Sequence, residues 1–232
     1  GLSPYIIVAI FFTALFAPII SANDTTISSN TTWSGNITLE GNVTISQGTT
    51  LIVAPGTTID GGDGFAIEVY GTLNAQSCYF YSSANPTAQS SHGQGLWQGI
   101  VIKSGGSATI TDVEIENTNV GVKSEGNLDV DNLTVRDSYL GIKNYGTANI
   151  EEFYSEYIDY EAIMNSGSLT LSAANISNTS TGIQSTGTLE VTNSSFSHIG
   201  AAITVKSGAA TVNQIRLHTV SVGLSSVAGV KF

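Results

Sequence analysis

The sequence predicts an all-β fold, a right-handed parallel β-helix of roughly eight to nine coils with about 20 residues each, preceded by a hydrophobic N-terminal α-helix. Two observations predict it. A glycine recurs at nearly constant spacing in the second half of the chain, and residues 2–22 form an apolar run without charge. We therefore expect two units, a helix over residues 1–22 and one β-helix domain over residues 23–232.

The repeat is marked by glycines that lie 20 or 21 residues apart. They are Gly106, Gly126, Gly146, Gly167, Gly187, Gly208 and Gly229. Apolar residues stand two and four positions after each of the first six glycines, as Leu128 and Val130 do after Gly126. Alternation with a period of two predicts a strand with one buried face.

Two further positions repeat in each unit. Nine residues after the glycine comes a mostly apolar position: Ile115, Val135, Ser155, Ile176, Phe196 and Leu217. Later in each unit a small residue precedes an aliphatic one, and the aliphatic residues are Val122, Ile142, Ile163, Ile183, Ile203 and Leu224. Each unit therefore predicts three short strands separated by Gly, Asn and Ser corners.

Earlier coils follow the same pattern less regularly. Ala66 and Ile67 lead to Gly71, and a Ser-rich insertion at 81–95 precedes the next coil. Further upstream the alternating apolar residues are Val43, Ile45, Leu51, Val53 and Ile59. Such units bury their apolar face only by stacking at about 4.8 Å per coil.

This pattern, with Trp97, Gly99 and Ile100 in a Trp-x-Gly-Ile arrangement, resembles the parallel β-helix repeat of pectate-lyase-like and related surface proteins. The resemblance covers nearly all of residues 35–230. It implies the fold and says almost nothing about function, because this fold carries many unrelated activities.

The apolar run from Leu2 to Ala22 would reach about 30 Å as a helix, the thickness of a bilayer's hydrocarbon core. Its large apolar side chains are the expected assembly residues: Leu2, Tyr5, Ile6, Ile7, Val8, Ile10, Phe11, Phe12, Leu15, Phe16, Ile19 and Ile20. Three interpretations stay open, a retained filament-core helix, a membrane anchor and an uncleaved signal peptide that ends in Ser21 and Ala22. Pro18 is expected to kink or end the helix.

The start GLSPYIIVAIFF resembles archaeal type IV pilin-like proteins, whose mature chains begin near a Ser-Pro followed by an apolar helix. The resemblance implies that a peptidase removes a leader upstream of Gly1, which fits the missing initiating Met, and that exposed helices bundle into a filament core. The chain departs from bacterial pilins at Tyr5, where those proteins commonly carry a glutamate. The resemblance covers about 20 residues.

The chain is acidic, with 7 basic and 18 acidic residues and a formal net charge of −11. A surface with so few basic residues excludes binding to nucleic-acid backbones. It favours glycans, cations or copies of the same chain as partners, with a membrane as partner before assembly. Cys78 is the single cysteine, so no intrachain disulfide forms, and its core-facing position predicts an inert thiol. We expect no cofactor.

Acceptor sequons for N-glycosylation indicate an extracellular location. Asn-x-Ser/Thr occurs eight times, about twice as often as chance gives. The candidate sites are Asn23, Asn30, Asn36, Asn42, Asn132, Asn175, Asn178 and Asn193.

Two polar clusters are candidate chemical sites. Asp129, Asp131 and Glu151 are expected to face outward on neighbouring coils, where paired carboxylates could serve glycosidic chemistry or form only a solvated acidic face. The repeat also predicts a ladder of Lys103, Lys123 and Lys143, either an anion site or ordinary residues near acids such as Glu125.

Three other segments carry weaker signals. Residues 151–161 combine five acids with Tyr154, Tyr157 and Tyr160, which predicts either a gripping surface for sugars or subunits or a bulged coil. Asp60 to Gly64 resembles a calcium-binding turn, although glycines beside aspartates also make tight corners. His92 in the insertion has no visible partner.

Together these patterns predict a structural subunit of an extracellular, cell-surface filament rather than an enzyme. A membrane-anchored adhesin or glycan-binding module is the alternative, and a polysaccharide lyase or hydrolase is the third, less favoured hypothesis. We also expect the last unit, from Gly223 to Phe232, to leave an uncovered β-helix edge, because it lacks a polar capping helix.

Overall fold

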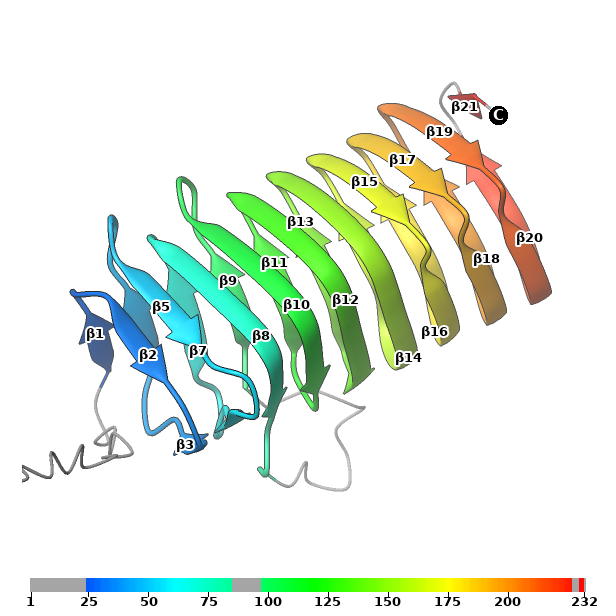
Figure 1. Cartoon of the computed structure of the whole chain (residues 1–232). Helices are drawn as coiled ribbons and strands as arrows, with labels where there is room; N and C mark the ends of the chain where they lie inside the picture. Colours follow the sequence, from blue (N-terminus) through cyan, green and yellow to red (C-terminus); the bar gives the residue numbers. More distant parts are fainter. Residues whose placement is uncertain (1–23, 85–96, 227–229, 232) are drawn as a thin grey trace, which may run out of the picture.

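The computed structural model describes residues 24–84, 97–226 and 230–231. They form a parallel β-solenoid of about nine coils with about 21 residues per coil (Figure 1). This confirms the all-β class, the coil number and the repeat. The expected helix over residues 1–22 lies outside the described residues. Within the described ranges, no helix is long and apolar enough to cross a membrane.

The strands pair in register from coil to coil and build three parallel stacks. Stack 1 contains β2 (Thr31–Trp33), β5 (Thr50–Val53), the first parts of β8 (Thr72–Tyr81), β10 (Ser107–Glu116), β12 (Asn127–Ser138) and β14 (Thr147–Asn165), then β15 (Ser168–Ser172), β17 (Thr188–Thr192), β19 (Ala209–Asn213) and β21 (Val230–Lys231).

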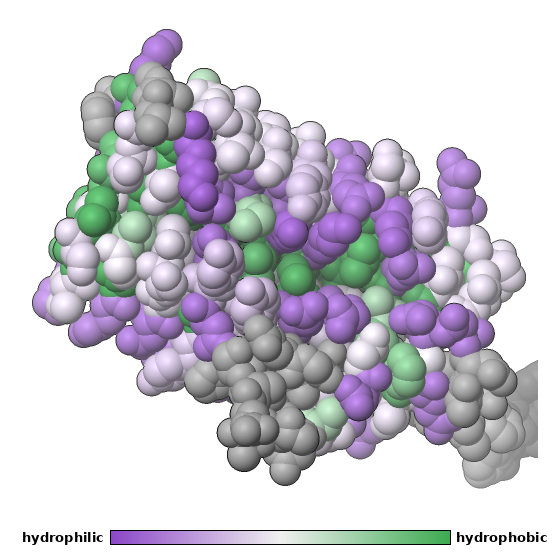
Figure 2. Space-filling view, turned by 180° about the vertical axis from the view of Figure 1, so that it is seen from behind, coloured by the Kyte–Doolittle hydropathy of each residue, from purple (hydrophilic) through white to green (hydrophobic). Residues whose placement is uncertain are grey.

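Stack 2 contains β3 (Asn36–Thr38), β6 (Thr58–Asp60), the later parts of β8, β10 and β12, the middle of β14, and the first parts of β16 (Asn175–Ser185), β18 (Ser195–Val205) and β20 (Arg216–Ser226). Stack 3 contains β1 (Thr25–Ile27), β4 (Val43–Ile45), β7 (Ala66–Val69), β9 (Gly99–Ile102), β11 (Val120–Ser124), β13 (Leu140–Asn144) and the last parts of β14, β16, β18 and β20. Polar side chains cover much of the outer surface in Figure 2, whereas apolar ones gather at the C-terminal end, on the left of that view.

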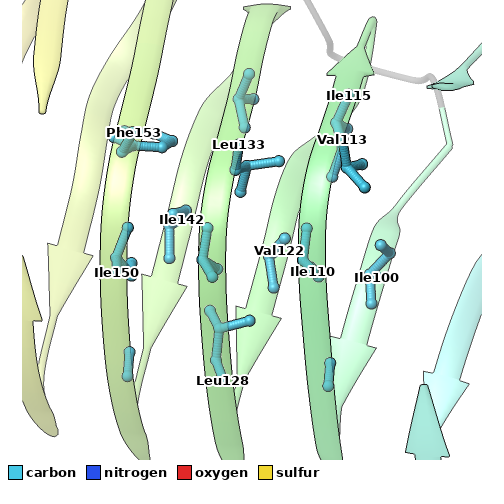
Figure 3. Close-up of a cluster of buried hydrophobic side chains, with 14 of the residues drawn as sticks. Ile100, Ile110, Val113, Ile115, Val122, Leu128, Leu133, Ile142, Ile150 and Phe153 are labelled. Atoms are coloured by element: carbon cyan, nitrogen blue, oxygen red, sulfur yellow. The ribbon is translucent and has the colours of Figure 1, made fainter. Parts of the chain in front are cut away.

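The core is a set of continuous aliphatic columns. In stack 3, Ile100 pairs with Val122, which pairs with Ile142, and the column continues through Ile163 and Ile183. All five side chains are fully buried. Figure 3 shows the first three opposite the apolar side chains of the other stacks. The aliphatic ladder predicted from the repeat is therefore confirmed.

The recurring glycines follow from a close approach between coils. A Cβ atom on Gly146 would lie 2.0 Å from the carbonyl oxygen of Gly126, and one on Gly126 would lie 2.2 Å from that of Gly106. Gly167, Gly187 and Gly208 stand in the same relation to the glycine before them. A side chain does not fit at this corner, which explains why the spacing of glycine reports the length of each coil.

Two other corners place non-glycine residues at positive φ. The first corner contains Ser77, Asp112, Asn132, Glu152, Ala173, Asn193 and Gln214, and the second contains Asn117, Asp137, Tyr157, Asn178, His198 and Thr219. Asn and Asp are enriched here because they tolerate the left-handed region better than other side chains.

One buried column is polar, which the repeat did not predict. Asn144 and Asn165 point inward in stack 3 and are essentially unexposed. Asn144 Nδ2 donates to Asn165 Oδ1 at 2.9 Å, and Asn165 Nδ2 donates to Ser185 Oγ at 3.0 Å and to the Thr188 carbonyl at 2.9 Å. The bonds between coils offset the loss of hydration of these buried amides.

Candidate functional site

The predicted acidic patch forms on the outer face of stack 1. Asp129 pairs with Asn149 and Asp131 pairs with Glu151, so the three carboxylates lie on two adjacent strands. They face an open hollow of about 500 Å³ that is otherwise lined mostly by threonines, serine and asparagine. All three side chains are exposed, so the patch is a solvated acidic surface.

The predicted lysine ladder is wrong at its first member. Lys143 pairs with Lys123, but Lys123 pairs with Val101, because two extra residues, including Gly105 at φ 83°, lengthen the preceding corner. Lys103 is thereby displaced along the chain from the column that its spacing to Gly106 predicted.

The lysines are matched by acids and tyrosines. Lys103 Nζ lies 2.7 Å from Glu68 Oε1, and Lys123 Nζ lies 2.7 Å from Glu125 Oε1. The Nζ atoms of Lys123 and Lys143 lie 5.7 Å and 5.4 Å from the ring centre of Tyr145. These contacts satisfy the lysines locally, and they agree with the interpretation as ordinary surface residues rather than an anion site.

A network of charged and aromatic side chains on stack 2 was missed from the sequence. Tyr79 Oη donates to Glu116 Oε2, and Arg136 Nη2 lies 2.6 Å from Glu114 Oε1 and 3.2 Å from Glu116 Oε2. Burial, with the hydrogen bond to Glu116, raises the pKa of Tyr79 well above its ordinary value. The insertion obscured this group, because it separates Tyr79 from Glu114 by more than one repeat although they pair on adjacent strands.

Hollows flank this network on both sides. One of about 460 Å³ reaches Thr58, Tyr79 and Glu114, and one of about 230 Å³ reaches Arg136 and Tyr154. Arg136 Nη2 already contacts two carboxylates, which would compete with an acidic ligand for the guanidinium. Among the residues that the structure describes, no group of three His, Cys, Asp or Glu side chains converges on a metal position.

The aromatic and acidic segment of β14 contains the predicted bulge. The pairing between β14 and β16 shifts register between Ile158 and Glu161, as expected for a coil with one extra residue. Tyr154, Tyr157 and Tyr160 remain 41–51% exposed. The segment therefore offers three aromatic side chains to solvent, whereas the adjoining Glu161 is buried.

Glu161 supplies a pH-dependent prediction. Burial raises the pKa of its carboxyl, against the opposing effect of Lys206 and Lys143, and its Oε2 atom has no hydrogen-bond partner among the described residues. A raised folded-state pKa makes stability highest below the ordinary pKa of glutamate and lowers it as the pH rises through the raised value. Glu161→Gln is expected to raise the free energy of unfolding at pH 7 by about 1 kcal/mol and to change nothing near pH 3. Urea unfolding at both pH values measures this difference, with the exposed Glu190→Gln as control, and a variant destabilised at pH 7 would contradict it.

The sequon asparagines differ in their exposure and in the hydrogen bonds that their side-chain amides make. Asn30, Asn36, Asn175 and Asn193 are exposed. Asn132 and Asn178 are half-buried at positive φ and donate to Asp112 and Glu156. Asn42 donates through Nδ2 to Asp24 and accepts from the Ala66 amide. Asn23 lies outside the described residues. Part of the sequon excess thus reflects corners that favour asparagine.

The remaining candidates have local structural roles. The Asp60 carboxylate accepts hydrogen bonds from the amides of Gly62 and Ser83 and from the Ser83 hydroxyl, so it holds the turn before the insertion. Cys78 is buried, and burial raises the pKa of its thiol to about 12, as expected for an inert cysteine. His92 lies outside the described residues.

Comparisons with known proteins give no relative for this chain. No family model, no curated protein and no solved structure matches it. A proposal for its function therefore rests on the sequence and on the geometry and chemistry of the solenoid.

Proposed function

We propose that the chain is a structural, non-catalytic subunit of an extracellular filament or pilus-like appendage on the cell surface. In this proposal the helix of residues 1–22 drives assembly and the solenoid is the exposed, glycosylated head. The observation that carries it is that an uncharged apolar segment directly precedes an acidic solenoid. The formal net charge of the whole chain is −11. The two parts favour different surroundings, apolar neighbours for the segment and water for the solenoid.

The energetics favour self-association of the segment. A helix that is apolar around its circumference has no face to hide against an acidic head. Burying it among identical helices removes on the order of 1,500 Å² of apolar surface from water, worth tens of kcal/mol before entropy is subtracted. Before assembly, a membrane supplies the same apolar surroundings.

Sedimentation velocity tests the role of the segment. The full chain is expected to be polymeric without detergent, and a chain starting at Asn23 is expected to be folded and monomeric. A full chain with Ile7→Glu and Phe11→Glu is the matched control, and it should behave like the shortened chain. A monodisperse full-length monomer in detergent-free buffer would overturn the filament proposal, and a particle that needs detergent or lipid would support an anchor.

Glycan occupancy of the head is expected to follow the geometry of the amides. Asn36 is exposed in β3, so we expect it to carry a glycan when the chain is secreted by its own cell. Asn42 is expected to stay unmodified, because its Nδ2 donates to Asp24 and its Oδ1 accepts from the Ala66 amide. Glycopeptide mass spectrometry distinguishes the two sites, and a glycan on Asn42 with Asn36 bare would contradict the prediction.

A membrane-anchored adhesin or glycan-binding module is the second candidate, favoured by the exposed Tyr154, Tyr157 and Tyr160. Exposed aromatic rings beside acids can stack on sugars. Binding to a glycan array that is lost in Tyr154→Ala would support it. A polysaccharide lyase stays the third candidate, and turnover of acidic polysaccharides by the full chain is its test.

A further inference from the structure

The C-terminal end of the solenoid exposes core positions that are closed one coil earlier. Leu217 is 50% exposed, whereas Phe196, its partner on the preceding strand, is fully buried. An apolar recess of about 360 Å³ lies at this end and reaches Ile203, Val212 and Leu224. Figure 2 shows apolar side chains gathered there. Exposed apolar surface of this kind marks an interaction surface.

Strand edges are open at both ends of the described solenoid. In stack 3, β20 pairs with β18 on one side, and at the other end β1 pairs with β4, and the described residues supply neither with a second partner. In stack 1, the described residues likewise give β21 and β2 a partner on one side only. Unpaired edges of parallel strands are templates for the addition of further strands.

Charge distinguishes the two ends. Residues 24–68 contain five acids and no Lys or Arg. Residues 191–232 contain three basic residues and no acid. Two C-terminal ends would repel one another, whereas the C-terminal end of one copy complements the N-terminal end of another.

From these observations we infer that the open C-terminal coil, β20 and β21, docks on the N-terminal coil, β1 to β3, of a second copy of this chain. The inference rests on the proposed self-assembly and adds a head-to-tail contact to it. This contact forms between copies that residues 1–22 already hold together, and alone it is too weak to associate a chain that starts at Asn23. A copy translated along the solenoid axis runs in the same direction, so its strands continue each stack in parallel. A head-to-tail contact that does not close on itself extends into a filament.

The register names two residues that meet in this arrangement. Thr26 in β1 and Ser225 in β20 are exposed ends of one outward column of stack 3, in which each residue pairs with the next from coil to coil. Docking places them on adjacent strands at about 4.8 Å. That spacing lies within the range of Cα separations that a disulfide spans, about 4.4–6.8 Å.

The test is a full chain carrying Thr26→Cys and Ser225→Cys under mild oxidation, with Cys78 buried and inert. Head-to-tail docking gives a ladder of dimers, trimers and longer species, and neither single variant gives any. A dimer from Ser225→Cys alone would replace the inference by two-fold docking of C-terminal ends. Thr170→Cys combined with Ser225→Cys, in which the first cysteine lies on the exposed face of stack 1, controls for random collision and should give no ladder.

Two substitutions probe the contact itself. Adding Leu217→Glu to the double-cysteine chain should lower the cross-linked fraction about tenfold or more, because docking would bury an unpaired carboxylate. Arg216→Glu should lower it several-fold at low salt, because it removes a basic residue from the C-terminal end and adds an acid there. Both positions are exposed, so these variants leave the solenoid intact. No response to any of these changes would overturn the inference.

The inference and the proposed function fail separately. Filaments of the full chain without a ladder would overturn the head-to-tail contact and leave the helix-driven filament standing. Conversely, Ile7→Glu with Phe11→Glu could leave both the particle size and the cross-linked ladder unchanged. That result would support the head-to-tail contact and overturn the role of residues 1–22 in assembly.

Discussion

Ile183→Asp is expected to lower the free energy of unfolding by about 4 kcal/mol or more. Ile183 is fully buried in stack 3, between Ile163 and Ile203 in the same column. An aspartate there would hold a charge, or accept a proton at a cost, between two apolar neighbours. Because each coil contacts mainly its neighbours, the damage should spread from this coil toward both ends. Thermal unfolding followed by circular dichroism measures the loss.

The adjacent residue gives the control for this substitution. Gln184 faces outward on the same strand, so Gln184→Asp should change stability by about 0.5 kcal/mol or less. Equal stability of Ile183→Asp and the unsubstituted chain would contradict the register of stack 3. Loss in both variants would indicate a general intolerance of acid in this strand.

Gly146→Ala is expected to cost about 3 kcal/mol despite adding one methyl group. The new Cβ would lie 2.0 Å from the Gly126 carbonyl oxygen, so the backbone of one coil must move. Displacing this corner also strains the bonds that Asn144 makes in the adjoining buried column. Urea unfolding measures the loss of stability.

The control for the glycine is the next residue. Thr147 is exposed, so Thr147→Ala should be nearly neutral. A neutral Gly146→Ala would mean that coils are further apart at this corner than the structure has them. It would also remove the explanation for the recurring glycine.

The sequence predicted the regular coils because their constraints are local. The glycine corner excludes a side chain, and the aliphatic column requires one residue type at a fixed offset, so both leave a period of 20 or 21 residues. The spacing from one glycine to the next therefore predicts that Ile163 and Ile183 are neighbours in the core, as the structure shows.

The glycine spacing predicts the wrong position where a longer corner or an insertion changes the number of residues in a coil. Lys103 was placed in the wrong column because two extra residues precede Gly106, and the Tyr79 network was missed because residues 81–95 interrupt the repeat. The acidic patch of Asp129 and Asp131 lay within regular coils and was placed correctly. Its openness could not be predicted, because the shape of a hollow depends on side chains from several strands.

Electron microscopy of the purified full chain, without detergent, tests the central claim most directly. We expect filaments of uniform width with acidic solenoid heads on the outside, and their loss in a chain carrying Ile7→Glu and Phe11→Glu. A field of separate particles, each the size of one solenoid, would contradict the claim that this chain is a subunit of a filament.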